Sequence, residues 1–240
     1  MPTGFWRRLR TLLLWLVGGW LALTAGSVLA LRWLHPLTSA FILESYAGAW
    51  LAHDFRWRAE HEWTPYARIS THLKLAVIAS EDQKFAFHPG FDFEAIDAAL
   101  RERERGRRLR GASTISQQVA KNLFLWPGPN LLRKGLEAYL TALIELLWPK
   151  QRILEVYLNL AEFGPGVYGV GAAARHYFQT EPARLTPTQS ARLAAVLPSP
   201  KRLHVERPSG YLQRREARIL EQMRALGGAS YLHEFDSAHP

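Results

Sequence analysis

Two adjacent acids at the end of an apolar stretch are the first residues that could do chemistry. Glu81 and Asp82 follow residues 73–80, whose apolar side chains recur every three or four positions and predict a helix. The C-terminal end of a helix disfavours negative charge, which raises the pKa of a carboxyl and suits it to act as a general base. Adjacent helical residues point about 100° apart, so the two acids cannot both face the same reacting atom. We predict Glu81 as the base, since it lies one turn from Val77 on the packed side, and Asp82 as a structural acceptor; an ordinary surface acid pair is the alternative.

A polar stripe follows on a second predicted helix. It consists of Thr114, Gln117, Gln118 and Lys121, opposite an apolar stripe of Ile115, Val119 and Leu123. A solvated face normally mixes Glu with Lys, whereas this one offers a hydroxyl, two amides and an ammonium, with Asn122 nearby. Such groups hydrogen-bond sugars and phosphates, so the stripe predicts a ligand-facing surface. Ser113 precedes the helix and could cap it, which is the structural explanation for that serine.

Two cations stand where a helix favours anions. If Asn130 is the N-cap, Arg133 and Lys134 lie in the first turn, against the helix dipole, and Arg133 precedes Glu137 in the less favourable order for a pair four residues apart. A bound anion such as pyrophosphate would relieve this arrangement, because arginine binds phosphate in a bidentate manner. Glu137 is then a second carboxylate of the site. An ordinary surface salt bridge is the alternative.

The N-terminal segment predicts a membrane anchor. Residues 11–31 form an uncharged run of 21 residues, and at ~1.5 Å per residue such a helix spans the roughly 30 Å hydrocarbon core. Arg7, Arg8 and Arg10 precede the run and only Arg32 follows closely, so the N-terminus should be cytoplasmic and the remaining chain extracytoplasmic. A cleaved signal peptide is the alternative, although its apolar region is usually shorter.

Helical spacing dominates the rest of the chain. Helices are expected behind an N-cap at Asp92 and over about 136–147, 153–160, 170–178, 187–197 and 212–226, whereas 162–166 is a turn cluster and the tail after Gly228 is expected to be loose. The arginine-rich run 101–110 is typical of a solvated helix end, with anionic lipid contact as the functional alternative.

Composition limits the classes of function. The 240 residues suffice for one well-buried domain with a short appendage, and 48% hydrophobic with 21% charged residues excludes a disordered or fibrous chain. The net charge of +9 favours anionic partners, and the absence of cysteine excludes disulfides and thiolate chemistry. An outward-facing domain argues against nucleic acid as the partner.

Four motifs occur in a characteristic order. They are EDxxFxxHxG at 81–90, RGxSTIxQQxxKN at 110–122, RKxxE at 133–137 and KxxILExYLN at 150–159. In this order they resemble the peptidoglycan glycosyltransferases of glycosyltransferase family 51, the module also found in class A penicillin-binding proteins. The resemblance extends from about Leu73 to Pro200, and a chain of this length resembles the monofunctional, Gram-negative branch.

The resemblance implies a mainly α, lysozyme-like fold with two lobes around a cleft. It places residues 1–10 in the cytoplasm, 11–31 in the inner membrane as a single-pass helix, and 32–70 next to the membrane; 71–228 would form the periplasmic glycosyltransferase domain and 229–240 a C-terminal tail. The implied activity is polymerisation of lipid II in cell wall biosynthesis. The growing chain, linked through pyrophosphate to undecaprenol, is the donor, and the GlcNAc 4-hydroxyl of lipid II is the acceptor. Cell-division or elongation proteins are the candidate protein partners.

Residue roles are carried over onto matching positions. Glu81 matches the catalytic glutamate, Lys121 and Arg133 match contacts to the donor phosphates, and Lys134 is a weaker candidate for the same role. Glu137 matches the second catalytic carboxylate, which would orient cations or a Mg²⁺ or Mn²⁺ ion; no organic cofactor is implied. The other predicted substrate-binding residues are Asp82, Phe85, His88, Ser113, Thr114, Gln117, Gln118 and Asn122. His88 has no partner at metal-ligand spacing, so a structural hydrogen bond is expected of it.

Two rival functions stay open on the sequence. A muramidase or lytic transglycosylase shares a helical scaffold and a single glutamate, but it cleaves glycan and needs neither Lys121 nor Arg133. A membrane-tethered scaffold protein would use the basic face to hold anionic partners and would tolerate loss of Glu81. Product length separates the first rival from a polymerase, and the Glu81→Gln variant separates the second.

Overall fold

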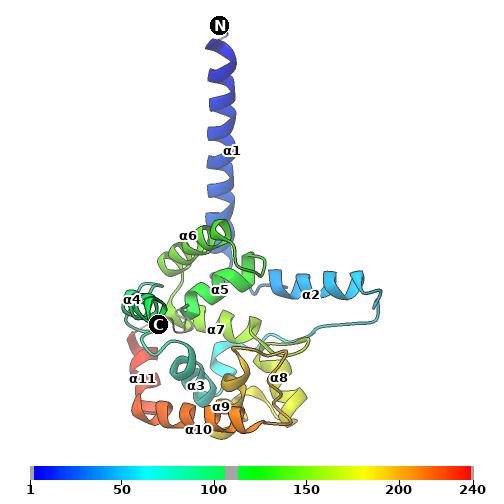
Figure 1. Ribbon diagram of the computed structural model, residues 1–240, viewed down its shortest axis with the longest axis vertical. Helices are drawn as coiled ribbons and strands as arrows, with labels where there is room; N and C mark the ends of the chain where they lie inside the picture. Colours follow the sequence, from blue (N-terminus) through cyan, green and yellow to red (C-terminus); the bar gives the residue numbers. More distant parts are fainter. Residues whose placement is uncertain (1–2, 106–112, 239–240) are drawn as a thin grey trace.

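The computed structural model describes residues 3–105 and 113–238, and these are mainly helical (Figure 1). The helices are α1 (Thr3–Ala30), α2 (Ala40–Leu51), α3 (Thr71–Glu81), α4 (Phe93–Glu104), α5 (Ile115–Phe124), α6 (Leu131–Leu147), α7 (Lys150–Leu160), α8 (Gly169–Phe178), α9 (Pro187–Val196), α10 (Gly210–Ala225) and α11 (Ala229–Ala238). Short 3₁₀ turns lie at Tyr66–Arg68 and Pro182–Arg184, and the strands are β1 (Glu60–His61), β2 (Glu162–Gly164) and β3 (Val167–Tyr168).

Helix α1 projects from the body of the molecule as one long rod (Figure 1). Its segment Trp6–Ala30 is long and apolar enough to cross a membrane, and 6% of its most apolar window is buried in the protein. The helix begins earlier than the predicted span 11–31 and ends one residue before it, because an uncharged run marks where lipid can surround a helix and not where the helix itself starts.

The other helices form two groups (Figure 1). In one, α3 packs against α9, α10 and α11; in the other, α5 packs against α6 and α7, with α2 against α5 and the base of α1 against α6. The buried apolar side chains of α3, α5, α6 and α7 belong to one continuous core that joins the groups. The two-lobed, mainly α fold expected from the sequence is therefore confirmed, and the residues of interest lie where the groups meet.

Helix α3 is the most enclosed element of the first group. Residues 73–79 are all buried, including the aliphatic stem of Lys74, which is 4% exposed. Ser70 caps the helix by accepting a hydrogen bond from the backbone of His72, and the helix ends at Glu81, before Asp82 turns away. A helix buried on every side is held rigidly, so its last residue has a fixed position.

A small sheet was not predicted. Its strand order is β1-β3-β2, with β1 parallel and β2 antiparallel to β3. The predicted turn cluster at 162–166 is only partly a turn, because 162–164 form strand β2 and only 165–166 connect it to β3. Strands of two or three residues are too short for alternating hydrophobicity to appear in a sequence, so only the pairing of distant segments reveals them.

The tail after Gly228 is helix α11, which corrects the expectation of a loose end. Leu232 is 2% exposed and Phe235 is 3% exposed, and the Phe235 ring stacks on Phe85 at 5.8 Å between centroids. Asp236 accepts a hydrogen bond of 2.6 Å from the hydroxyl of Tyr66. Two buried apolar residues among ten are too few to predict a packed helix from the sequence. In the structure α11 packs against α3, which covers them.

The arginine-rich run 101–110 is described only in part. Asp92 caps α4 as predicted, and the helix ends at Glu104 with exposed Arg101 paired to Asp97. Residues 106–112 lie outside the described part of the chain. The expectation of a solvated helix end therefore holds for 101–105, and the alternative of lipid contact stays a prediction.

Candidate active site

Glu81 lies where three helices meet. It is the last residue of α3, and its side chain is 13% exposed. Its Oε2 accepts a hydrogen bond of 3.1 Å from Nε2 of Gln118 on α5, and its Oε1 lies 3.4 Å from the guanidinium of Arg215 on α10. One carboxylate is thus held from two sides by groups that leave each oxygen able to accept a further hydrogen bond.

The pKa of Glu81 is raised above its ordinary value, mainly because burial disfavours the charged form. The hydrogen bond from Gln118 and the charges of Arg215 and Lys121 oppose this rise, and the charge of Asp82 adds to it. The direction agrees with the sequence prediction, but burial is its largest cause and not the helix dipole. A carboxyl that is more basic than usual yet still partnered by cations suits proton abstraction.

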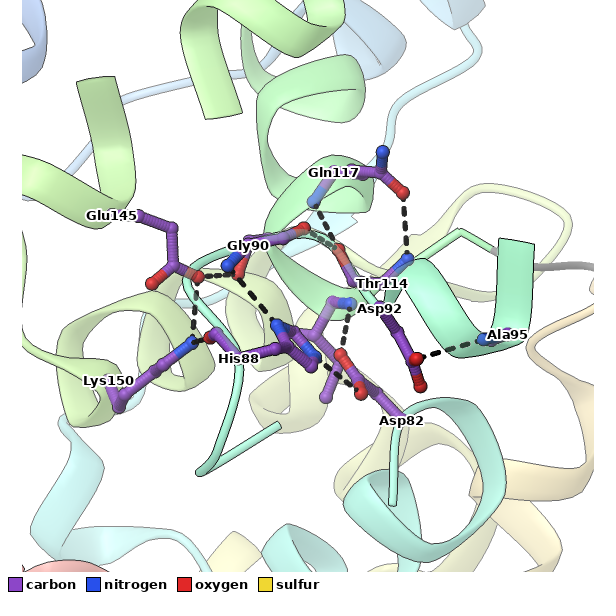
Figure 2. A network of polar contacts seen from close by, with 11 residues as sticks. Asp82, His88, Gly90, Asp92, Ala95, Thr114, Gln117, Glu145 and Lys150 are labelled. Atoms are coloured by element: carbon purple, nitrogen blue, oxygen red, sulfur yellow. Dashed lines mark hydrogen bonds and ion pairs between the residues drawn. The ribbon is translucent and has the colours of Figure 1, made fainter. Parts of the chain in front are cut away.

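Asp82 performs a different task (Figure 2). Its Oδ1 accepts a hydrogen bond of 2.8 Å from Nε2 of His88, and its Oδ2 accepts one of 3.0 Å from the backbone of Ile115 at the start of α5. The backbone N–H of Gly90 donates to Nδ1 of His88 at 3.2 Å, so the ring proton is on Nε2 and points at Asp82. Asp82 is therefore the structural acceptor that the sequence predicted.

Thr114 and Gln117 begin α5 as a reciprocal capping box. The Thr114 hydroxyl oxygen accepts from the backbone of Gln117 at 3.2 Å, and Oε1 of Gln117 accepts from the backbone of Thr114 at 3.0 Å. The same hydroxyl donates to the carbonyl of Gly90 at 2.7 Å (Figure 2). Thr114, and not Ser113, is the cap. Ser113 lies exposed before the helix.

Lys150 also belongs to this network (Figure 2). Nζ of Lys150 donates to the carbonyl of His88 at 2.7 Å and to Glu145 at 2.8 Å. Gly90 has a positive φ of 88°, and a Cβ on it would lie 2.8 Å from side-chain carbons of Glu145 and Thr141, so only glycine fits. The loop after Glu81 is thereby fastened to α5, α6 and α7.

The outer part of α5 faces a cavity. Gln118, Lys121 and Asn122 line it, and Oε1 of Gln118 accepts a hydrogen bond of 3.3 Å from the hydroxyl of Tyr157. Nζ of Lys121 lies 5.4 Å from the ring centroid of Phe41, which comes from α2. Oδ1 of Asn122 is buried with no hydrogen-bond partner among the described residues, so an incoming donor would find an unsatisfied acceptor there.

The second carboxylate is enclosed by cations. Glu137 has 3% of its side chain exposed; Arg133 donates to its Oε2 at 2.6 Å, and Lys134 pairs with its Oε1. Asn130 is the N-cap of α6, as predicted, and accepts from the backbone of Arg133 at 3.3 Å. Because Arg133 has only 11% of its side chain exposed, the alternative of an ordinary surface salt bridge is wrong.

Lys121 joins the two carboxylates into one charged region. Its pKa is lowered, chiefly by burial, and it interacts electrostatically with Glu137, Arg133, Lys134 and Glu81. Since Lys121 interacts with both acids, Glu81 and the cluster of Arg133, Lys134 and Glu137 belong to one region, as the sequence predicted. A basic carboxylate beside a group of cations can remove a proton while a neighbouring anion is stabilised.

The cavity beside Gln118 and Lys121 has a volume of about 410 Å³, and its lining residues do not include Glu81, Arg133, Lys134 or Glu137. It is enclosed by α2, α5, α7, β2 and the turn that follows α9. Its polar lining comprises Glu44, Ser45, Gln118, Lys121, Asn122, Tyr157, Glu162, Tyr168, Ser199, Lys201 and Arg202. This size and the many hydrogen-bonding groups suit a sugar better than an apolar ligand.

Several predicted substrate-binding residues do not face the cavity. Phe85 is fully buried, and Asp82, His88, Thr114 and Gln117 are at most 8% exposed and hydrogen-bond within the network of Figure 2. We therefore correct their role from contact with the substrate to support of Glu81 and α5. Gln118, Lys121 and Asn122 line the cavity, as a ligand-facing stripe should.

Two residues of the site were missed. Arg215 lies four residues before the buried Ile219 and three after the buried Leu212, so a cation on the apolar face of α10 was the available signal. Tyr157 is 2% exposed and was expected only as part of a core helix. Neither position reveals its partner, because Arg215 and Glu81 are 134 residues apart in the chain.

The donor groups do not form a ready metal site. Each oxygen of Glu137 is already paired with a cation, and the described residues contain no group of three His, Asp or Glu side chains able to hold an ion. A divalent cation needs several oxygen ligands around it. These residues therefore do not fit a protein-held Mg²⁺ or Mn²⁺ ion at Glu137.

Comparisons with known proteins match almost the whole chain. The sequence model of the family described as Transglycosylase matches residues 50–224. A "Biosynthetic peptidoglycan transglycosylase" of Pseudomonas entomophila (strain L48) is 52% identical over 238 residues, covering 99% of each chain. The protein of the same name from Pseudomonas putida (strain KT2440) is 53% identical, covering 97% of this chain and 96% of its own, and that from Xanthomonas campestris (strain B100) is 52% identical, covering 94% and 93%.

Proposed function

This chain belongs to the transglycosylase family, whose domain is lysozyme-like, and on that premise we propose that it polymerises peptidoglycan glycan strands. The donor is the growing glycan, joined through pyrophosphate to an undecaprenyl lipid. The acceptor is lipid II, through the 4-hydroxyl of its GlcNAc. A β-1,4 bond forms between that oxygen and the donor's anomeric carbon, while the bond from this carbon to the pyrophosphate breaks, with inversion.

Glu81 is the base of this reaction. As the acceptor hydroxyl attacks, its proton passes to the Glu81 carboxylate, which Gln118 and Arg215 hold in place. The raised pKa of Glu81 makes it a stronger proton acceptor than an exposed glutamate. The proton then leaves to water when the product moves away.

The cations at the start of α6 stabilise the leaving group. Negative charge grows on the departing pyrophosphate, and Lys121, Arg133 and Lys134 place positive charge in the same region. Glu137 pairs with two of these cations and so holds them in position. No step requires a metal bound to Glu137; a divalent ion that takes part would have to be carried by the pyrophosphate itself.

Helix α1 brings the enzyme to its substrate. A lipid-linked sugar leaves the bilayer at a cost of ~0.8 kcal/mol for each buried CH₂, so an anchored enzyme meets it within the membrane plane. The start of α1 carries three arginines, Arg7, Arg8 and Arg10, which favour a cytoplasmic N-terminus. Helix α1 would then lie in the inner membrane and the catalytic domain in the periplasm. Division or elongation proteins remain candidate partners of the anchored chain.

The observation that carries this proposal is the partly enclosed Glu81, which Lys121 links electrostatically to a second acid that is itself paired with Arg133 and Lys134. Lysozyme-like hydrolases also use a glutamate, but cleaving a glycan releases no pyrophosphate and gives a cation cluster no charge to stabilise. The full chain in detergent with purified lipid II should therefore produce polymer and undecaprenyl pyrophosphate. It should release no fragments from isolated glycan.

The decisive variant is Glu81→Gln. Loss of a general base reduces the rate by about 10²–10⁴-fold, so gel analysis of the glycan product should show almost no polymer. Glu94→Gln is the matched control, because Glu94 has 84% of its side chain exposed and contacts only the surface residue Lys84 among the pairs described for it. Wild-type rates from Glu81→Gln, or fragments in place of polymer, would overturn the proposal.

A further inference from the structure

A second cation reaches Glu81 from the side opposite α5. Arg215 approaches Oε1 to 3.4 Å, and the pair has 25% and 13% of its side chains exposed. Nε of Arg215 also donates to the carbonyl of Ala195, near the end of α9, at 3.1 Å. The guanidinium is therefore tied to backbone at one end and faces the carboxylate with the other.

The charged and titratable groups that act on Glu81 come from its own chain neighbour and from three other helices. Asp82 follows it in the chain, Lys121 comes from α5, Tyr157 from α7 and Arg215 from α10. Lys121 interacts most strongly with Glu137, whereas Arg215 forms its ion pair with Glu81. Among these groups Arg215 opposes the effect of burial on Glu81 more strongly than Lys121 does.

A buried base requires such a partner. Burial favours the protonated form of a carboxyl, and a protonated Glu81 could not accept a proton from the acceptor sugar. Gln118 supplies a neutral hydrogen bond, and its orientation is set because its Oε1 accepts from Tyr157. The Gln118 hydrogen bond opposes the effect of burial on the pKa of Glu81 most, and the charge of Arg215 follows it. Arg215 is therefore the main ionic partner of Glu81, and a guanidinium forms a charge-assisted contact that a neutral amide cannot.

Resting on the function proposed above, we propose that Arg215 is a positioning residue that keeps Glu81 ionised and aims it at the acceptor hydroxyl. Arg215 holds Oε1 while Gln118 holds Oε2, so the carboxylate cannot rotate, and each oxygen keeps one lone pair for the incoming sugar. In this proposal Arg215 contacts neither the donor phosphates nor the bond that breaks, and its effect on the reaction passes through Glu81.

A neighbouring ion pair offers an internal comparison. Arg192 on α9 donates to Glu216 on α10 at 2.7 Å, one residue from Arg215. This pair also holds α10 against α9, but it does not reach Glu81. Removing Arg192 therefore loosens the contact between α9 and α10 but keeps the Arg215 charge that faces Glu81.

The test is the pH profile of lipid II polymerisation. Removing the cation in Arg215→Gln raises the pKa of Glu81, so the acidic limb of kcat/KM moves to higher pH. An opposite charge at this distance shifts the pKa of a carboxyl by about one unit or more. We therefore expect kcat/KM to fall roughly 10-fold or more at about pH 6, and to fall less at about pH 9. Arg215→Lys keeps the charge and should restore part of the acidic limb.

Two further variants separate electrostatics from folding. Arg192→Gln should lower the midpoint of thermal unfolding without moving the acidic limb, and exposed Arg214→Gln should change neither. An Arg215→Gln enzyme whose rate falls equally at every pH, or an Arg192→Gln enzyme with the same shifted limb, would overturn the inference. Wild type that forms no polymer would instead refute the proposed function.

Discussion

Glu81 and Asp82 are adjacent acids with opposite environments. Both oxygens of Asp82 accept from buried donors, those of His88 and Ile115, and Asp82 is itself buried away from the cavity. Glu81 meets Gln118 and Arg215 at the meeting point of α3, α5 and α10, next to the cavity-lining end of α5. A single peptide bond thus separates a support from a base, because a helix end directs consecutive side chains to different sides.

We predict that Asp82→Ala destabilises the protein strongly. It leaves two buried donors unpaired, each costing about 1–3 kcal/mol, so the free energy of unfolding should fall by about 2–5 kcal/mol. Urea denaturation of the full chain in detergent measures this. Asp97→Ala is the control, since Asp97 pairs with Arg101 on the surface and such pairs contribute about 0–1 kcal/mol. Equal losses from both variants would contradict the role given to Asp82.

At the scale of elements, α11 supports the loop that carries the network of Figure 2. Phe235 stacks on Phe85, the fully buried aromatic residue of that loop, and Tyr231 stacks on Phe235 at 6.5 Å between centroids. Gln151 on α7 also donates to Asp236, at 3.3 Å to its side chain. The last helix therefore closes the core behind the base, although it contributes no group to the cavity.

Phe235→Ala should release α11 and loosen the loop in front of it. Truncation of a buried phenylalanine costs about 3–5 kcal/mol, which exceeds what a short terminal helix retains by other contacts. Hydrogen exchange should become faster across residues 82–90 and 229–238. Phe87→Ala, with a side chain that is 80% exposed, should leave exchange unchanged. Protection retained in Phe235→Ala would show that α11 does not support the loop.

At the scale of the whole molecule, α1 is joined to the helix that carries Glu137. The carbonyl of Val28 accepts a hydrogen bond of 2.7 Å from Nε1 of Trp148, the residue that follows α6. The carbonyl of Leu31 accepts a hydrogen bond of 2.9 Å from Arg152 on α7. The last carbonyls of a helix have no partner within it, so side chains of α6 and α7 satisfy these groups. Helix α1 and the cation cluster are consequently parts of one packed body.

Trp148→Phe tests that attachment. Without the indole N–H, the buried carbonyl of Val28 loses its partner at a cost of about 1–3 kcal/mol, so amide exchange should speed up near residues 28–34 in detergent. Trp33→Phe is the control, because Trp33 is 67% exposed. Polymerisation by the anchored enzyme in liposomes should fall more in Trp148→Phe than in the control. Identical exchange in both variants would show that α1 is not held by Trp148.

Much of the local structure was determined by the sequence alone. The apolar period predicted α3, α5 and α6, and short-range capping predicted the starts of α4 and α6 at Asp92 and Asn130. These features involve residues three or four apart, so their physics lies within one turn. The uncharged N-terminal run likewise predicted a helix able to cross a membrane.

Tertiary structure alone decided which polar residues serve the cavity and which serve the core. Thr114 and Gln117 share a face with Gln118, yet the first two cap a buried helix start while Gln118 reaches Glu81. The contact between Arg215 and Glu81 joins residues 134 positions apart. No local spacing encodes such a pair, because burial and electrostatic partnership depend on which distant helix covers a side chain after folding.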